Sequence, residues 1–289
     1  MSTFRKALQD KDFVIAAELP LSANMSGRSV VASAAKLMER VDGLVLTDNR
    51  FGQTHMSSLA AASLLLRENI DPVLQLSCRN RNRIAILSEL LGARAIGVSS
   101  LYLVQGEKIP EALKPRPKSV MDMQVKELVA TARMINDDEE LENAEPFLIG
   151  TSALVHKPVE GWKPDELQAK CDAGAQLLFT QLCFDVGVMR DYLAMLVGEG
   201  LVRRASIVAN IGVLPSGDYA RWIRENRRRA LLPDALIERL EKASDSEREG
   251  IAICSELIRD YSEVPGIAGV SVSTTGGMET IVAAIEGAG

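Results

Sequence analysis

The stretch Leu74-Gln-Leu-Ser-Cys-Arg-Asn-Arg-Asn-Arg83 joins an apolar run to a basic, polar one. Residues 72–77 have the composition of a buried strand, and an amphipathic segment over residues 84–91 begins directly after the third arginine. Fixed cations and amide donors between a strand and a helix can hold an anion or a phosphorylated cofactor. The alternative is a solvated, basic helix start, because runs of charge usually face water.

The same order, a short strand followed by an amphipathic helix, recurs along the whole chain. We expect eight strands, at residues 13–19, 43–47, 72–77, 101–104, 147–151, 177–181, 206–211 and 267–272. We expect helices at residues 27–40, 57–67, 84–96, 122–135, 164–173, 218–228, 233–243, 246–261 and 278–286, and one more that ends at residue 196. Eight such units in 289 residues predict a (β/α)8 TIM barrel, with residues 1–289 as one catalytic domain.

A doubly wound open sheet is the structural alternative to the barrel. That fold usually carries a glycine-rich nucleotide motif, and the chain has neither a GxGxxG sequence nor a Walker motif. The sequence therefore favours the barrel. In a TIM barrel the C-terminal ends of the strands carry the chemistry, so polar residues at those ends are the candidates for a site.

Composition and charge exclude several classes of protein. The net charge of −6 argues against a general nucleic-acid binder, which needs a basic surface. The four cysteines are scattered, with no CxxC and no Cys/His pair at metal spacing, so we expect reduced thiols and no metal site. The start lacks the apolar core of a signal peptide, and no apolar run approaches ~18 residues. We therefore expect a cytoplasmic protein that does not cross a membrane.

One acidic residue stands inside an apolar strand. Glu18 lies within Ile15-Ala-Ala-Glu-Leu19, where burial would raise the pKa of its carboxyl and suit it to proton transfer. The alternative for Glu18 is a buried structural salt bridge. Other strand ends also carry polar groups, namely Thr47, Gln75, Gln105, Glu107, Gln181 and Asn210.

A set of short segments carries a resemblance to a known family. They are Ala17-Glu-Leu-Pro20, Leu46-Thr-Asp-Asn49, His55-Met-Ser-Ser-Leu-Ala60, Gln75 to Arg83, Asp172-Ala-Gly-Ala175, Phe179-Thr-Gln181, Phe184-Asp185, Gly212-Val-Leu-Pro215, Leu232-Pro-Asp234 and Glu249-Gly-Ile251. In this order they resemble the methylenetetrahydrofolate reductase family, over about residues 13–289. The combination is specific, although no single segment is.

The resemblance implies a flavoprotein oxidoreductase that reduces 5,10-methylenetetrahydrofolate to 5-methyltetrahydrofolate, a small-molecule substrate of one-carbon metabolism. NADH or NADPH would pass a hydride to FAD, and the folate would then take its place over the flavin. Glu18 matches the family's acid, which protonates N10 of the folate. Substrate-binding positions correspond to Gln181, Trp222 and Ile223. Cofactor-binding positions correspond to Thr47, Gln75, Arg81, Arg83, Gln105, Gly106, Glu107, His156 and Lys170.

Several of these residues also have purely structural interpretations. Gln181 could satisfy the top layer of the barrel, Trp222 and Ile223 could be core residues, and His156 could make local hydrogen bonds. The chain also departs from the family, with Glu107 where an aspartate is common and no aromatic residue after the fifth strand.

These departures keep several functional alternatives open. They are a flavin-independent reductase of the same folate, a reductase acting on another one-carbon pterin, and a non-catalytic folate- or flavin-binding partner subunit. Retention of Glu18 with Gln181 speaks against the pure binder, because a binder would not need the acid. We also expect a homo-oligomer, since barrels of this kind often associate through outer helices.

Overall fold

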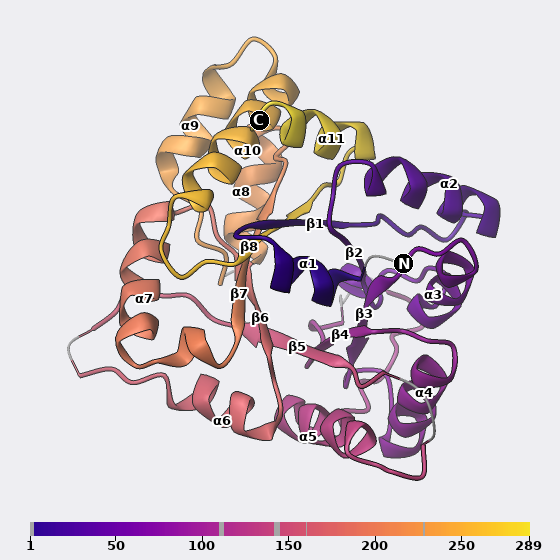
Figure 1. The fold of residues 1–289 in the computed structure, drawn as a ribbon. Coiled ribbons are helices and arrows are strands. Elements are labelled where there is room, and N and C mark those ends of the chain that lie inside the picture. The colour runs from indigo at the N-terminus through magenta and orange to yellow at the C-terminus, as the bar shows by residue number, and fades with distance from the viewer. Residues whose placement is uncertain (1–2, 110–112, 142–144, 160, 228) are drawn as a thin grey trace.

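The computed structural model describes residues 3–109, 113–141, 145–159, 161–227 and 229–289. Eight parallel strands close into one barrel in the order β1 to β8 (Figure 1). The strands are β1 (Val14–Glu18), β2 (Gly43–Leu46), β3 (Pro72–Ser77), β4 (Ser100–Val104), β5 (Leu148–Ala153), β6 (Leu177–Leu182), β7 (Ser206–Gly212) and β8 (Gly269–Ser273). The expected (β/α)8 TIM barrel is confirmed.

Helices surround the barrel and form its outer layer. They are α1 (Phe4–Asp10), α2 (Gly27–Met38), α3 (Ser58–Arg67), α4 (Arg83–Ala95), α5 (Val125–Asn136), α6 (Asp165–Ala173), α7 (Val186–Gly198), α8 (Gly217–Asn226), α9 (Asp234–Lys242), α10 (Ser246–Ser262) and α11 (Met278–Glu286). Two short 3-10 turns, η1 (Arg50–Gly52) and η2 (Leu201–Arg203), lie between them. The helix expected at residues 218–228 corresponds to α8, and its expected end at residue 228 lies outside the described residues.

Two apolar layers hold the barrel together. Inward-facing side chains such as Val45, Val73 and Phe179 fill its interior, and a larger layer packs between the strands and the helices. Helix α1, which the sequence patterns did not predict, covers the N-terminal end of the barrel (Figure 1). Its Phe4 ring occupies the space above Gly43, where a Cβ atom would lie 2.5 Å from the ring. The opposite end is left for the site.

Several boundaries differ from the expected ones for local reasons. Helix α5 begins at Val125 rather than residue 122, because Gln124 and Glu127 form a capping box that fixes its start. Helix α4 begins at Arg83, where the Asn82 side chain accepts a hydrogen bond from the Ala85 amide. Strand β5 extends two residues further than expected, through Ala153.

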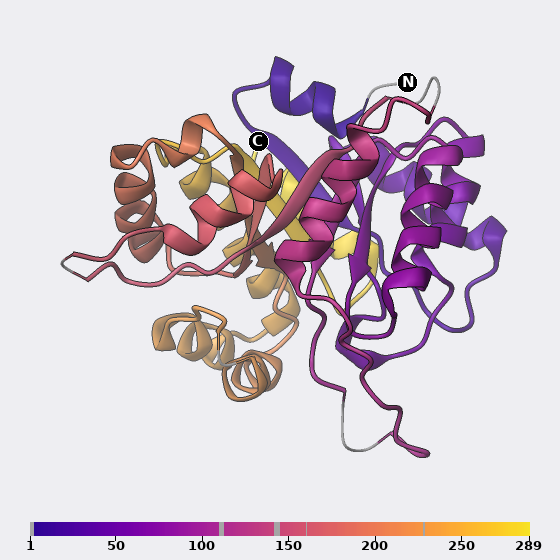
Figure 2. The ribbon, with the colours of Figure 1, turned by 90° about the horizontal axis from the view of Figure 1, so that it is seen from below.

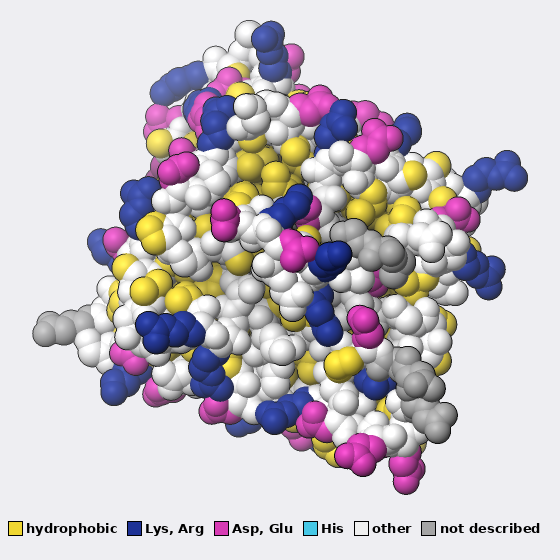
Figure 3. All heavy atoms as spheres, in the orientation of Figure 1, with side chains coloured by type: hydrophobic (Ala, Val, Ile, Leu, Met, Phe, Trp, Pro, Cys, Tyr) yellow, Lys and Arg dark blue, Asp and Glu magenta, His cyan; other side chains and the backbone are white. Residues whose placement is uncertain are grey.

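The C-terminal end of the barrel is flanked by two projecting parts of the chain. Helices α8 and α9 extend beyond it on one side, and residues 105–109 and 113–124, between β4 and α5, extend on the other (Figure 2). Over the face seen in Figure 3, acidic and basic side chains are interspersed, with no extended area of one sign.

Candidate active site

Glu18 ends β1 at the C-terminal mouth of the barrel, and its carboxylate pairs with an arginine. Arg50 Nη1 lies 2.7 Å from Glu18 Oε1, and the two side chains are only 21% and 13% exposed respectively. Burial raises the pKa of the Glu18 carboxyl, and the Arg50 guanidinium opposes part of that rise. The expected burial of Glu18 is therefore present, together with the salt bridge of the structural interpretation.

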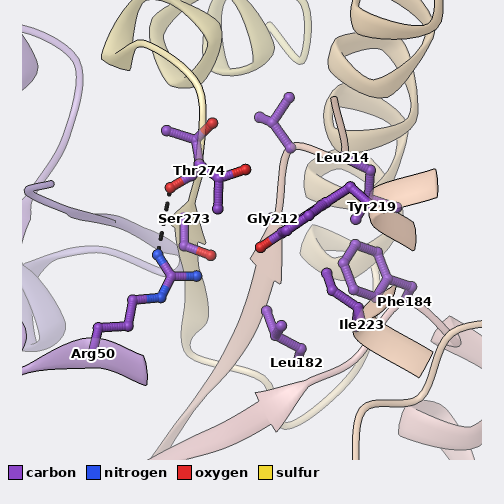
Figure 4. Close-up of a pocket in the computed structure, with 11 residues that line it drawn as sticks. Arg50, Leu182, Phe184, Gly212, Leu214, Tyr219, Ile223, Ser273 and Thr274 are labelled. Carbon is purple, nitrogen blue, oxygen red and sulfur yellow. Dashed lines mark hydrogen bonds between the residues drawn. The ribbon is translucent and has the colours of Figure 1, made fainter. Parts of the chain in front are cut away.

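Arg50 is placed by the turn that follows β2. Asn49 adopts a left-handed conformation with φ of 53°, which asparagine tolerates better than most residues, and η1 starts directly after it. The turn directs the guanidinium back over the mouth, where it also donates to the Thr274 carbonyl oxygen at 3.4 Å (Figure 4). Arg50 thus links the ends of β1 and β8.

A second acid–arginine pair crosses the same mouth. Both Nη atoms of Arg227, from the segment after α8, donate to the Glu107 carboxylate after β4. The guanidinium of Arg227 also lies 5.9 Å from the centre of the Trp222 ring, which is stacked on Tyr219 at 5.7 Å. Two carboxylates and two guanidinium groups therefore face one another at the mouth, and the charge of Glu107 contributes to the raised pKa of Glu18.

The ends of β2 and β3 form a buried polar network around Asp48. Ser77 donates to this carboxylate through both its amide, at 2.9 Å, and its hydroxyl, at 2.6 Å. Arg81 donates at 2.6 Å, and Gln75 accepts from the Asp48 amide at 2.9 Å. Burial by itself would raise the pKa of the Asp48 carboxyl, but the bonds from Arg81 and Ser77 outweigh it and lower the pKa.

The arginine–asparagine run that opens α4 does not form one anion cradle. Arg79 is 2% exposed and donates to the Asn49 and Glu107 carbonyl oxygens, at 3.4 and 3.2 Å. Arg81 turns to Asp48, while Arg83 points outward and pairs with Glu127 of α5 at 3.0 Å. The three arginines therefore serve three places, and only the first two lie beside the mouth.

Gln181 is held by a bulge in β6. The register between β6 and β7 shifts between Phe179 and Leu182, which re-aims the side chain in between. The Gln181 oxygen accepts from the Val155 amide at 2.8 Å, and its nitrogen donates to the Val155 carbonyl at 2.7 Å. Its amide thus satisfies the top of the barrel, and it keeps one N–H and one lone pair for a ligand.

The remaining expected cofactor residues are spread around the rim. Gln105 accepts from the Val125 amide at 3.3 Å, which ties β4 to the start of α5. Gly106 has φ of +89°, and a Cβ atom there would lie 2.7 Å from Arg79 Cβ, so the turn requires glycine. The Lys170 ammonium donates to the Ser152 carbonyl oxygen at 2.8 Å and pairs with Glu166.

His156 packs into a ring cluster beside β5. It makes edge contacts with Trp162 and Tyr192, at centroid distances of 4.6 and 5.5 Å. The expected residues Thr47, Gln75 and Arg81 lie together at the ends of β2 and β3, whereas His156 and Lys170 lie beside β5. The structure therefore brings some expected cofactor contacts together and separates others.

A small pocket opens beside Arg50 (Figure 4). Its apolar wall contains Leu182, Phe184, Tyr219 and Ile223, and its polar wall contains Ser273, Thr274 and the Arg50 guanidinium. Ile223 is 2% exposed and belongs to the core, whereas Trp222 is 40% exposed on the outer side of α8. Tyr219, which the sequence patterns did not single out, adds an aromatic ring to the apolar wall of this pocket.

The sequence patterns also missed Arg50 and Arg227. Arg50 directly follows the Thr-Asp-Asn segment already singled out, so its position at the end of the second strand could have indicated it as a site residue. Arg227 stands in an arginine run that is typical of a helix end, and nothing local indicates a partner 120 residues away.

The described residues form neither a metal site nor a membrane span. None of their histidine, cysteine, aspartate and glutamate side chains gather in groups of three that could hold a metal ion. No described helix is both long and apolar enough to cross a membrane. All four cysteines are buried and unpaired.

Comparisons with known proteins agree with the resemblance. The family model for methylenetetrahydrofolate reductase matches residues 3–285. A Caenorhabditis elegans protein described as a probable methylenetetrahydrofolate reductase (NADPH) is 30% identical over 143 residues, which are 47% of this chain and 20% of that protein. The chain therefore spans about a fifth of the length of that relative.

Solved structures share the fold at low sequence identity. A Clostridium thermocellum protein that binds two copies of 5-methyl-5,6,7,8-tetrahydrofolic acid is similar, with a TM-score of 0.68 and 15% identity. That match covers 98% of this chain and 96% of the other. A 2,3-dimethylmalate lyase has a TM-score of 0.53 and 12% identity, covering 99% and 83%. Because the family model covers nearly the whole chain, the chain belongs to the methylenetetrahydrofolate reductase family.

Proposed function

We propose that this barrel reduces 5,10-methylenetetrahydrofolate to 5-methyltetrahydrofolate, with Glu18 as the acid. The observation that carries the proposal is the buried Glu18 carboxyl at the barrel mouth, whose pKa is raised. The family supports a reductase, and the folate-binding structural neighbour supports a pterin ligand for this kind of barrel. In this proposal, residues 1–289 form one catalytic domain.

The need to protonate the leaving nitrogen explains why the acid must be buried. The substrate's one-carbon bridge opens at N10, and an amine nitrogen is a poor leaving group unless it is protonated. A carboxyl whose pKa is raised by burial holds a proton closer to neutral pH than an exposed glutamate does. Glu18 would therefore donate its proton to N10, and its carboxylate would pair with Arg50 again once the mouth is empty.

The polar groups beside the mouth fit the donors that a flavin dinucleotide needs. Gln75 uses its oxygen on the Asp48 amide, which leaves its NH2 group, and within the described part of the chain the Thr47 hydroxyl has no hydrogen-bond partner. These two groups would meet the ring system of FAD, and Arg81 would meet its phosphates or ribose. Arg83 and Lys170 would join them only by leaving their present partners, Glu127 and Glu166. Gln105, Gly106, Glu107 and His156 complete the proposed set. Bound FAD, reduced by NADH or NADPH, would supply the hydride.

The second substrate would lie on the opposite side of the mouth. The pocket of Figure 4 offers apolar and aromatic walls, with Ile223 and Tyr219 in its lining. Trp222, 40% exposed on the outer side of α8, stacks on Tyr219 behind that lining. The free N–H of Gln181 would donate to the pterin or its amide-bearing neighbour. The small volume of this pocket means that Arg50 would shift when a folate enters.

One observation favours a second candidate, the flavin-independent reductase of the same folate. The cations expected at the phosphates are already paired, Arg81 with Asp48, Arg83 with Glu127 and Lys170 with Glu166. A dinucleotide would have to displace or share these carboxylates. Direct transfer of hydride from NADH or NADPH to the folate would keep the role of Glu18 unchanged.

An absorbance spectrum of freshly purified protein separates the two candidates. A flavin band near ~450 nm that bleaches with NADH or NADPH supports the FAD route. A colourless protein that takes up no added FAD, yet oxidises a nicotinamide only when folate is present, supports direct transfer. A protein that does neither contradicts the proposed reductase.

The variant Glu18→Gln tests the acid itself. It should abolish folate reduction while sparing flavin reduction by the nicotinamide, because only the first reaction needs the proton on N10. The matched control is Glu199→Gln, an exposed glutamate at the end of α7, which should keep both reactions. Loss of both reactions in Glu18→Gln, in a folded protein, would refute the assigned role.

A further inference from the structure

Arg227 stands at the end of the helix that walls the small pocket beside Arg50. Tyr219 and Ile223 of α8 line that pocket, and the Arg227 amide, one helical turn further on, donates to the Ile223 carbonyl oxygen at 2.7 Å. The Arg227 side chain is 22% exposed, and its guanidinium lies 5.9 Å from the centre of the Trp222 ring. A largely buried cation therefore follows directly after the apolar wall.

Glu107 shows what chemistry this cation is oriented to bind. The two Nη atoms of Arg227 donate to the two carboxylate oxygens of Glu107, which is the two-pronged arrangement by which arginine recognises a carboxylate. Glu107 is the more exposed partner, at 41%, and belongs to the segment after β4, which flanks the mouth opposite α8 (Figure 2). The carboxylate of a ligand can replace it, because water reaches Glu107 where it stands.

The balance of charge at the mouth changes when the acid is protonated. With Glu18 ionised, two carboxylates balance the guanidinium groups of Arg50 and Arg227. Burial lowers the pKa of the Arg227 guanidinium, Glu107 opposes this, and the charge of Arg50 adds to it, so the two cations are close enough to repel each other. Once Glu18 carries the proton that its proposed role requires, these two cations face one carboxylate. A carboxylate of the substrate would restore the balance.

We propose that Arg227 binds the glutamate carboxylate of the folate, in exchange for Glu107. This inference rests on the proposed function, in which Glu18 lies at N10. Outward from N10, a folate has a benzoyl ring, then an amide, then the carboxylates of its glutamate. The site offers its groups in the same order, namely the acid, the apolar and aromatic wall, and Arg227. Arg227 would therefore distinguish a folate from a pterin that lacks the glutamate.

Calorimetric titration with two ligands tests this role without turnover. The ligands are 5-methyltetrahydrofolate and the corresponding pteroyl amide, which ends in an uncharged amide and lacks the glutamate. The wild type should bind the first roughly tenfold more tightly, because two charge-assisted hydrogen bonds gain more than this factor and the release of Glu107 offsets part of the gain. Arg227→Met should bind both ligands with similar affinity. Arg227→Lys keeps the charge but loses the fork, so its ratio should lie in between.

The variant Glu107→Gln should change the ratio in the opposite direction. It removes the internal competitor, so the preference for the glutamate-bearing ligand should rise several-fold above that of the wild type. In the double variant with Arg227→Met this gain should disappear, because it acts through Arg227. The matched control is Arg221→Met, also on α8, which pairs with Asp218 and Glu241 and should keep the wild-type ratio. A merely structural ion pair predicts instead that both single variants weaken the two ligands alike.

The possible outcomes separate this inference from the proposed function. Each ratio compares two ligands on one protein, so a partly unfolded variant does not change it. A wild type that binds both ligands equally, or an Arg227→Met protein that keeps the wild-type ratio, would overturn the role of Arg227 and leave the folate assignment standing. A wild type that binds neither ligand would overturn both.

Discussion

Replacing Arg50 by methionine tests whether the ion pair at the mouth sets the acidity of Glu18. The guanidinium opposes the rise in the Glu18 pKa that burial causes. Methionine fills similar space without the charge, so the pKa should move further upward. A general acid works only while protonated, and the rate of folate reduction falls as pH rises past its pKa. In Arg50→Met this decline should therefore begin at a higher pH than in the wild type.

The size of the effect follows from the geometry. With Nη1 and Oε1 at 2.7 Å, the two charge centres lie about 4 Å apart, which gives about 4 kcal/mol at an effective dielectric constant of about 20. Water reaches both side chains in part, and this reduces the net contribution to about 1–2 kcal/mol. At pH values above the range in which the wild-type rate declines, each rate can be expressed as a fraction of the same protein's plateau rate. This fraction should be roughly five- to thirtyfold higher in Arg50→Met than in the wild type.

The assay measures the single-turnover rate of folate reduction at pH values across the decline. The rates of each protein are divided by its plateau rate at low pH. Normalisation removes any change in folate binding from the comparison. Arg50→Lys keeps the charge and should stay close to the wild-type profile, and Arg190→Met, an exposed change on α7, should match it. A decline that stays in place or moves to lower pH in Arg50→Met would refute the reasoning.

Two further predictions concern stability. Asp48→Asn removes the closer of the two carboxylates beside the mostly buried Arg81, leaving only Glu89 at 3.8 Å, and should cost about 2–4 kcal/mol in urea unfolding at neutral pH. Because folding lowers the pKa of Asp48, its carboxylate contributes to the free energy of unfolding at pH values above 3.8, and this contribution is lost as pH falls through the lowered pKa. The stability of the variant should therefore depend less on pH in the acid range. Gly150→Ala places a Cβ atom 2.7 Å from the Leu101 carbonyl oxygen of β4 and should cost about 1–3 kcal/mol. Gly198→Ala, which meets nothing within 4 Å, should leave the urea midpoint unchanged or higher; equal losses in both variants would contradict the steric account.

The barrel could be predicted from the sequence because its signal is local and repeated. Each strand is a short apolar run and each helix has one apolar face, so errors at single elements do not change the fold. Helix α1 was missed because seven residues with Phe4 and Ala7 as their buried positions give too little periodicity to recognise. Its place under the barrel depends on Gly43, which is distant in sequence.

The site could be predicted only in part. Glu18 and Glu107 stand out because acids at the ends of apolar strands are unusual. Their partners come from positions 32 and 120 residues away, and such pairings are set by the closure of the barrel rather than by local pattern. The arginine–asparagine run shows the converse. Its three arginines alternate with asparagines, two residues apart, yet they bind Glu107, Asp48 and Glu127, which lie in three different places.

The two acid–arginine pairs make ligand binding at the mouth a competition between carboxylates. A folate carries carboxylates of its own, and one that attracts Arg50 would take the cation away from Glu18. By linkage, removal of that cation raises the pKa of Glu18 and favours its protonated form. Binding of an anionic substrate would thus prepare the acid for the step that needs it. A neutral pterin lacking those carboxylates would leave the Arg50–Glu18 pair intact, so it should be reduced more slowly even when it saturates the site.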